Sequence, residues 1–499
     1  MQTIPLQTDL RPALPNVYGT QDYHSFRETL VKIDEILVAS DLERDLILRA
    51  LDEHVKSNHL DREEFFNSKK SSVQYKKFKH ALRCNIARHL TGESYRLFSL
   101  RLADSALFQW FTEINDLSSC KAISKSSLER FEKYFDEEVV REQICKSFAK
   151  FSDEKTAAVV GLKDVVDFSD VLMDSTCVKA AIHFPVDWVL LRDAVRSLLL
   201  AIKTIRAQGL RHRMVEPSFF LKEMNKLCIN MTHTRRKKDG KKQRKAVLRT
   251  IKKLTNRVEQ HAKRYREILC HSWGKTTWSE AQSQQVVNRI DNILEQLPAA
   301  IKQAHERIIG ERSVQSKDKI LSLYDAEAEV IVRGKAGCEV EFGQRLLLAE
   351  QNDGLIVDWK LFKKQSPQDS KMLAPSIDRI EKHFGDINSC STDRGFSSSD
   401  NEKLLASKNI YNAICPKSPK QLEERLLEPV FIARQTRRSG TEARIGIFKN
   451  VFLGRPLRSR IFLNKCHAVN WCVLSHNLWV LSRKAISDER SSQEFRLAA

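Results

Sequence analysis

The sequence predicts an α/β fold in which a sheet-containing domain is interrupted by a mainly helical insertion and preceded by an all-α region. Three observations support this prediction. The first 150 residues show helical hydrophobic periodicity, as in "FRETLVKIDEILVAS". Segments rich in β-branched residues occur at 165–184 and again between 320 and 414, and residues 187–319 return to a helical pattern between them. Because strands flank the helical block, we interpret it as an insertion into one domain.

Composition indicates a globular protein with an anionic partner. The chain has 499 residues, a length that suffices for two to four domains. Of these residues 41% are hydrophobic and 30% are charged, which is typical of a globular protein. The 11 cysteines include no C-x-x-C pair, and no signal peptide or long apolar stretch is present, so we expect reduced thiols and a cytoplasmic protein without membrane contact. A formal net charge of +20 favours binding to nucleic acid.

The N-terminal region, 1–150, is predicted to consist of short helices. Gly92 should end one helix and Ser94 should cap the next, "YRLFSLRLAD". Ser126 and Glu129 form an S-x-x-E capping box at the start of another helix. Basic residues near these helix starts suit a helix-turn-helix-like module around 80–135. A small helical bundle with a basic surface is the alternative.

Two strands are predicted in "VVDFSDVLMDSTCVKAAIHFP". The first would end at Asp174, and the second would return through Val178 and Ile182 before Pro185.

The insertion, 187–319, contains apolar stripes at helical spacing and one strongly basic segment. The segment "TRRKKDGKKQRKAVLRTIKKLTNRV" has a dozen Lys and Arg residues and one acid, Asp239. A solvated helix face is the simpler explanation, but so uneven a charge favours contact with phosphates. The stripes are Leu248, Ile251, Leu254 and Val258, and Val286, Ile290, Ile293 and Leu297.

The C-terminal third is predicted to alternate strands and helices. Strands are predicted at 320–334 and within 344–362, where Asn352-Asp353-Gly354 is a hairpin-turn signal. A helix should end at Gly385, and strand, turn, helix and strand should follow through 387–416. A basic helix at 436–453, an apolar helix to 486 and a disordered tail, 487–499, complete the chain.

Three acids occupy positions from which a side chain can project out of a regular element: Asp174, Asp393 in "STDRGF", and Glu442 in "RRSGTEARIGIFKNVF". Each has a local explanation, namely an Asx turn, a turn residue and an Arg–Glu pair on a helix. Together, three converging carboxylates would repel one another unless a cation offset their charge. Hard oxygen ligands suit Mg²⁺ or Mn²⁺, and two such ions can support phosphoryl transfer.

The sequence resembles the bacterial insertion-sequence transposases with a DDE catalytic triad. The resemblance covers most of the chain and rests on "SYRLFSLRLADSALFQWF", "MDSTCVKAAIHFPVDWVLLRDAVRSL" and "STDRGFSSSDN". It rests most on "RSGTEARIGIFK", which fits Arg-x₃-Glu-x₆-Lys with Arg438, Glu442 and Lys449. The signature begins three residues before the Arg with Tyr, and here that position is Gln435.

The resemblance implies an RNase H-like catalytic domain over 160–186 and 320–486. It implies binding of the terminal repeats of a mobile element, metal-dependent cleavage of the DNA ends and strand transfer. The expected partners are double-stranded DNA and a second copy of the chain in a dimer on that DNA, with a nucleoid-associated location. Asp174, Asp393 and Glu442 would bind two Mg²⁺ ions, for which Mn²⁺ would substitute. The expected DNA-contacting residues are Arg235, Arg236, Lys237, Lys238, Lys241, Lys242, Arg394, Arg438 and Lys449.

Two other classes of protein remain open. A catalytically impaired, transposase-derived DNA-binding protein is favoured by Gln435 and opposed by the intact triad. A phosphatase-like hydrolase would use Asp174 in "MDST" as a nucleophile, but Thr176 stands where that chemistry usually places a second acid.

Overall fold

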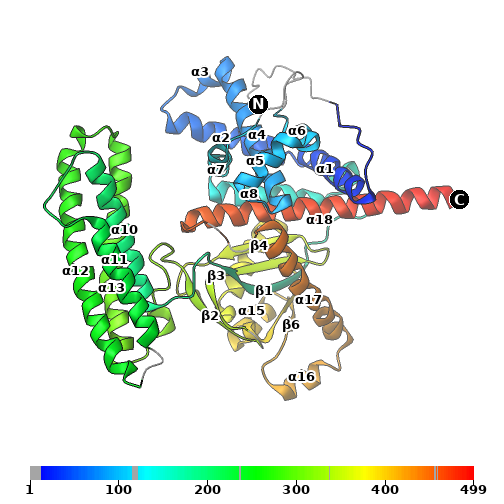
Figure 1. Cartoon of the computed structure of the whole chain (residues 1–499). Coiled ribbons are helices and arrows are strands. Elements are labelled where there is room, and N and C mark those ends of the chain that lie inside the picture. Colours follow the sequence, from blue (N-terminus) through cyan, green and yellow to red (C-terminus); the bar gives the residue numbers. More distant parts are fainter. Residues whose placement is uncertain are drawn as a thin grey trace. The chain divides into compact units, whose positions relative to one another are not determined.

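The computed structural model describes residues 13–114, 122–234, 238–335, 338–454, 457 and 459–498. The chain forms two compact units (Figure 1). The first unit comprises 1–178, 345–362 and 366–499, and the second comprises 179–344 and 363–365. The N-terminal helices therefore share a unit with most of the sheet, and the predicted insertion lies in the other unit.

Short helices form the N-terminal part of the first unit. Gly92 ends α4 with φ of +62°, and the Ser94 side chain accepts a hydrogen bond from the Leu97 amide, as predicted. The predicted cap at Ser126 is wrong, because the side chain of Ser124 accepts a hydrogen bond from the Ser127 amide and caps α7 two residues earlier. The helices are α1 (Gln21–Ala39), α2 (Leu42–Ser57), α3 (Arg62–Asn67), α4 (Lys69–Thr91), α5 (Tyr95–Asp104), α6 (Ala106–Thr112), α7 (Lys125–Phe131), α8 (Glu137–Ala149) and α9 (Glu154–Val159).

A mixed sheet follows these helices, with strand order β3-β1-β5-β6 and with β4 antiparallel to β3. The pairs β1–β5 and β5–β6 are parallel. The hairpin between β3 and β4 is confirmed, and Gly354 supplies the positive φ, +97°, that its turn needs. The strands are β1 (Asp170–Lys179), β3 (Cys338–Gln351), β4 (Ile356–Leu361), β5 (Ser389–Thr392) and β6 (Tyr411–Ile414).

The prediction of two strands around Asp174 is wrong. One strand, β1, runs through Asp174 without a break, and it includes Val178, which was assigned to a returning strand. Thr176 and Val178 are β-branched and buried, so the extended backbone continues beyond the acid.

Helices complete the first unit. Gly385 ends α14 as predicted, and strand, turn, helix and strand follow as expected in β5, α15 and β6. In Figure 1, α18 lies between the N-terminal helices and the sheet, and it contacts α1, α4, α8 and β4. The predicted disordered tail differs from the structure, because α18 continues through Ala498. The helices are α14 (Leu373–Phe384), α15 (Ser399–Ser407), α16 (Pro419–Arg425), α17 (Pro429–Ile447) and α18 (Phe462–Ala498).

The second unit contains a bundle of long helices with its own apolar core. Both predicted stripes face this core: Leu248, Ile251 and Val258 are fully buried, and Leu254 is half-buried. The strand predicted at 320–334 begins only at Glu329, because Ser322 and Asp325 form turns before it. The elements are α10 (Asp187–Ala207), α11 (Pro217–His233), α12 (Gly240–Ser272), α13 (Glu280–Ile308) and β2 (Glu329–Lys335), which pairs with the start of β3.

Within the described part of the chain, we find no helix that is both long and apolar enough to cross a membrane.

Candidate active site

Parallel pairing of β1 with β5 brings two of the predicted acids together. Met173 pairs with Thr392 in the register of these strands. Asp174, within β1, and Asp393, directly after the end of β5, are the residues that follow this pair. Neighbouring strands lie about 4.8 Å apart. The Ser175 amide donates to Asp174 Oδ1 at 2.7 Å, and the Gly395 amide donates to Asp393 Oδ1 at 2.9 Å. These backbone contacts orient both carboxylates.

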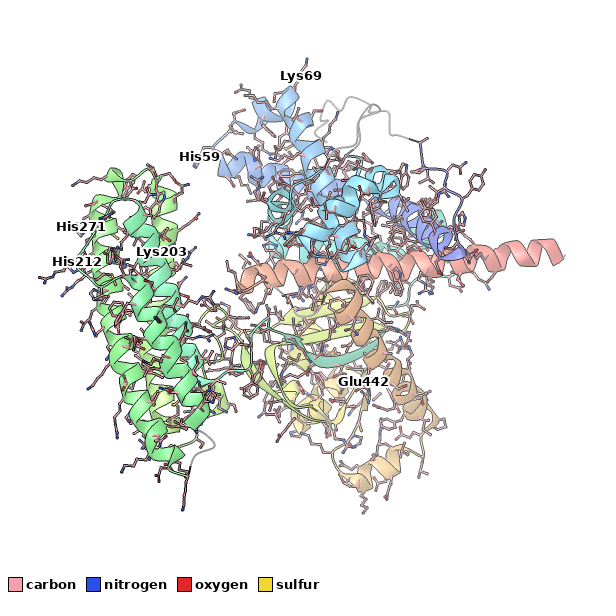
Figure 2. All side chains as sticks on the ribbon, viewed as in Figure 1. His59, Lys69, Lys203, His212, His271 and Glu442 are labelled. Atoms are coloured by element: carbon pink, nitrogen blue, oxygen red, sulfur yellow. The ribbon has the colours of Figure 1, made fainter. Side chains whose placement is uncertain are left out.

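The third acid, Glu442, lies on α17, which contacts β5 and β6 (Figure 2). Its side chain is exposed. Pro429 begins this helix, where the missing amide proton of proline costs no hydrogen bond. All three acids belong to the first unit, so one compact body carries the whole triad.

The surroundings of Asp174 raise its pKa to about 6. Burial is the largest cause, and the negative charges of Asp393 and Glu442 act in the same direction. The Ser175 amide and the Arg438 guanidinium act in the opposite direction. Three carboxylates that repel one another form a site at which a bound cation would lower the electrostatic free energy.

The chemistry of these donors fits a hard divalent cation, because all three supply carboxylate oxygens and their mutual repulsion is what such a cation relieves. The side chains themselves are not assembled around a common point. Among the described residues there is no group of three or more His, Cys, Asp or Glu side chains that could hold a metal ion. Glu442 is exposed, and its negative charge acts to raise the pKa of Asp174.

A buried carboxylate on β3, Glu350, attaches α17 to the sheet. The Thr441 hydroxyl donates to Glu350 Oε1 at 2.7 Å, and the guanidinium groups of Arg437 and Arg444 lie 3.5 Å and 3.3 Å from the same oxygen. Residues 437, 441 and 444 share one face of the helix, so this contact directs the adjoining residue, Glu442, away from β3. No local sequence pattern distinguishes Glu350 from other acidic residues on strands.

A second contact of the same kind involves Asp170, at the start of β1. Its carboxylate accepts hydrogen bonds from Arg434 on α17, from Asn352 Nδ2 at 2.8 Å and from Ser389 Oγ at 2.6 Å. Together Asp170 and Glu350 fix the position of α17 along the sheet.

The predicted phosphate-binding residues of the first unit differ in accessibility. Arg394 is exposed, and Arg438 is half-buried, with its Nε 3.0 Å from Gln435 Oε1. Lys449 is only 7% exposed, and its ammonium group donates to Thr176 Oγ1 at 3.0 Å, two residues after Asp174 on β1. The helix predicted at 436–453 is not α-helical throughout, because Phe448–Phe452, including Lys449, form a π-helical turn. Such turns are frequent at functional sites.

The predicted basic segment lies on α12 of the second unit and just before it. Lys238 and Lys242 are exposed, whereas Lys241 pairs with Glu311. Arg235, Arg236 and Lys237 lie outside the described residues. The exposed cations Lys242, Arg249 and Lys253 occupy one face of the helix, and no ion pair involves them within the described residues. We call these three residues the α12 basic face.

One comparison with known protein families finds a match to this chain. Residues 315–466 match the family model described as "Transposase DDE domain", a segment that includes Asp393, Glu442 and Lys449. Neither the search of curated proteins nor the search of solved structures finds a match to the chain. Residues 315–466 are thus similar to a transposase DDE domain, which supports a DDE transposase of the insertion-sequence type.

Proposed function

We propose that the protein binds the terminal repeats of its own mobile element, cleaves the DNA ends in a metal-dependent reaction and transfers the freed strands to target DNA. The observation that carries this proposal is the electrostatic coupling of Asp174 with Asp393 and Glu442, across strands and a helix far apart in sequence. The strand order and the parallel β1–β5–β6 arrangement support an RNase H-like catalytic domain. The family match supports phosphoryl transfer on DNA.

In this proposal the three acids hold two Mg²⁺ ions, for which Mn²⁺ can substitute. When bound, such ions activate the attacking oxygen and stabilise the leaving oxygen of a phosphodiester. The protein's own groups position the DNA: Arg394 and Arg438 are placed to contact phosphates, and Lys449 supports β1 through Thr176. Glu442 must move toward Asp174 and Asp393 to complete the ligand set, and its exposed position on α17 leaves space for that movement.

The remaining parts have separate roles in the proposal. The N-terminal helices around 80–135 read the terminal repeats, and the α12 basic face contacts phosphates without regard to sequence. Paired DNA ends call for a dimer of the protein on DNA, located at the nucleoid.

Glu442→Gln tests the proposal. The amide keeps the size of the side chain and a good helix propensity, but it loses the charge that a hard cation requires. We expect cleavage of labelled element ends in Mg²⁺ to fall at least about 100-fold, as for loss of a metal-dependent step, and affinity in a gel shift to persist. Asp174→Asn and Asp393→Asn should behave likewise, and the three losses should not add, because the acids act as one unit.

Glu423→Gln is the matched control, since Glu423 is an exposed acid on α16 of the same unit. Cleavage by Glu442→Gln at the wild-type rate would show that the third acid lies elsewhere.

The second candidate is a DNA-binding protein that has lost catalysis. Two observations favour it: Gln435 replaces the tyrosine of the signature, and the described residues include no assembled metal-binding group. Wild-type protein that binds element ends but leaves them uncut in Mg²⁺ and in Mn²⁺ would establish this candidate.

A further inference from the structure

Gln435 connects α17 to the ends of two strands beside the acids. Its side-chain amide donates to the Thr392 carbonyl at 3.2 Å and to the Ala413 carbonyl at 2.5 Å. Thr392 is the last residue of β5 and precedes Asp393, and Ala413 lies on β6. Only the NH₂ group of the amide can donate to two carbonyl oxygens, so these contacts determine which way the amide faces.

The opposite end of the same amide contacts Arg438. With the NH₂ group directed at the strands, Gln435 Oε1 accepts a hydrogen bond from Arg438 Nε at 3.0 Å. Because a guanidinium is planar, a contact at Nε sets the orientation of the whole group. The positive charge of Arg438 acts to lower the pKa of Asp174, so the two side chains interact electrostatically.

We propose that Gln435 is a positioning residue that uses the carbonyl groups of β5 and β6 as an anchor and holds the Arg438 guanidinium in the orientation needed at the acids. A tyrosine at this position has one hydroxyl hydrogen, so it could not donate to both carbonyl groups and also accept from Arg438 in the same way. Gln435 is therefore a functional replacement at this position of the signature. The inference rests on the proposed function, since the site it organises is the one proposed to cleave DNA.

A double-mutant cycle tests whether Gln435 acts through Arg438. The variants are Gln435→Met, Arg438→Met and the double variant. Methionine keeps side-chain length and helix propensity but supplies neither the amide donor nor its acceptor. Gln421→Met, at an exposed position on α16, is the matched control. Three quantities are measured for each protein: the single-turnover rate of end cleavage in Mg²⁺, the Kd for element-end DNA in EDTA, and the unfolding temperature.

We expect Gln435→Met to lower the cleavage rate about 10-fold to 100-fold, the range for loss of a hydrogen bond to a charged group. Arg438→Met should lower it at least as much, and the double variant should be no slower than Arg438→Met alone. Coupled residues give such non-additive effects, whereas independent ones multiply. The unfolding temperatures of the three variants should be close to that of the Gln421→Met control.

Several results would overturn the inference. Losses that multiply in the double variant would mean that Gln435 acts on the strands and not on Arg438. An unchanged cleavage rate in Gln435→Met would show that Gln435 has no role in positioning Arg438. A lower cleavage rate together with a large fall in unfolding temperature would show that Gln435 has a structural role only. If wild-type protein binds element ends but does not cleave them, the proposed function fails. The double-mutant cycle is then evaluated on the Kd for element-end DNA. Independent effects of Gln435 and Arg438 on this Kd would contradict the inference.

Discussion

Asp174 occupies a position that is unfavourable for an ionised carboxylate. It lies in the middle of β1 and is partly buried. The negative charges of Asp393, which follows the end of the adjacent strand β5, and of Glu442 both act on it. Its environment raises its pKa to about 6, from an unfolded value near 4. Acids with shifted pKa values are common at functional sites, because the chemistry there uses such values. The arrangement that shifts the pKa lowers the stability of the folded protein.

This pKa predicts how stability depends on pH. Between about pH 4 and pH 6 the folded protein holds a proton on Asp174 that the unfolded chain releases, so the free energy of unfolding falls as pH rises through this window. Asp174→Asn removes the effect. In EDTA at pH 7.5, we expect the variant to be more stable than wild type by up to about 2 kcal/mol, and the difference should vanish near pH 4.

Chemical denaturation at the two pH values measures the difference, with Asp386→Asn, at an exposed position before β5, as the control. Equal stability of Asp174→Asn and wild type at pH 7.5 would show that the carboxylate is not under strain in the folded protein.

At the scale of elements, polar contacts hold α17 against the sheet. Its exposed apolar residues include Val430, Ile432 and Ile447, so apolar burial alone does not determine its position. Glu350, 4% exposed, offers one carboxylate to Thr441, Arg437 and Arg444. Directional contacts of this kind specify the register of a helix, and here the register determines where Glu442 projects.

Glu350→Ala should therefore destabilise the protein by about 3 kcal/mol, because it leaves two guanidinium groups and a hydroxyl without their buried acceptor. Glu350→Gln should lose less, since the amide oxygen can still accept from Thr441. Denaturant unfolding gives the values. Glu423→Ala removes an exposed acid from the neighbouring α16 and should have little effect. A loss in Glu350→Ala no greater than in this control would contradict a role for Glu350 in attaching α17.

At the scale of the whole molecule, the chain divides its cationic surface and its acids between two units. The triad lies in the first unit, and the α12 basic face lies in the second, which has a separate apolar core. Basic residues that contribute to the net charge of +20 therefore occur in both units.

The α12 basic face predicts a salt-dependent share of DNA affinity. Replacing Lys242, Arg249 and Lys253 together with Gln should lower the slope of log affinity against log salt by about 2 to 3 units, near 0.9 for each lost phosphate contact. The loss should be similar on element ends and on unrelated DNA, because phosphate contacts carry no sequence information.

Lys245→Gln is the control, since Lys245 lies on the same helix but is paired with Glu311 at 2.8 Å. Titrations at several salt concentrations measure the slopes, and an unchanged slope in the triple variant would exclude phosphate contact by this face.

Local chemistry was sufficient for much of what the sequence predicted. Gly92 and Gly385 end helices, Gly354 forms the hairpin turn, and the stripes of the second unit face its core. These features depend on residues only a few positions apart, and the periodicity and turn preferences of a sequence report on that range. The three candidate acids were also selected from the sequence, by their projection from regular elements and by the spacing of the Arg-x₃-Glu-x₆-Lys signature, and their role stays a prediction.

Only the tertiary structure decided how those acids are arranged. It showed that β1 continues past Asp174, that the β1–β5 register sets Asp174 beside Asp393, and that Glu442 stays exposed. It also identified Glu350 and Gln435, whose partners on other elements are far from them in sequence. The physical reason is that strand pairing and helix docking are determined by contacts across long loops, where many pairings satisfy the same local pattern and only packing of the whole unit selects one.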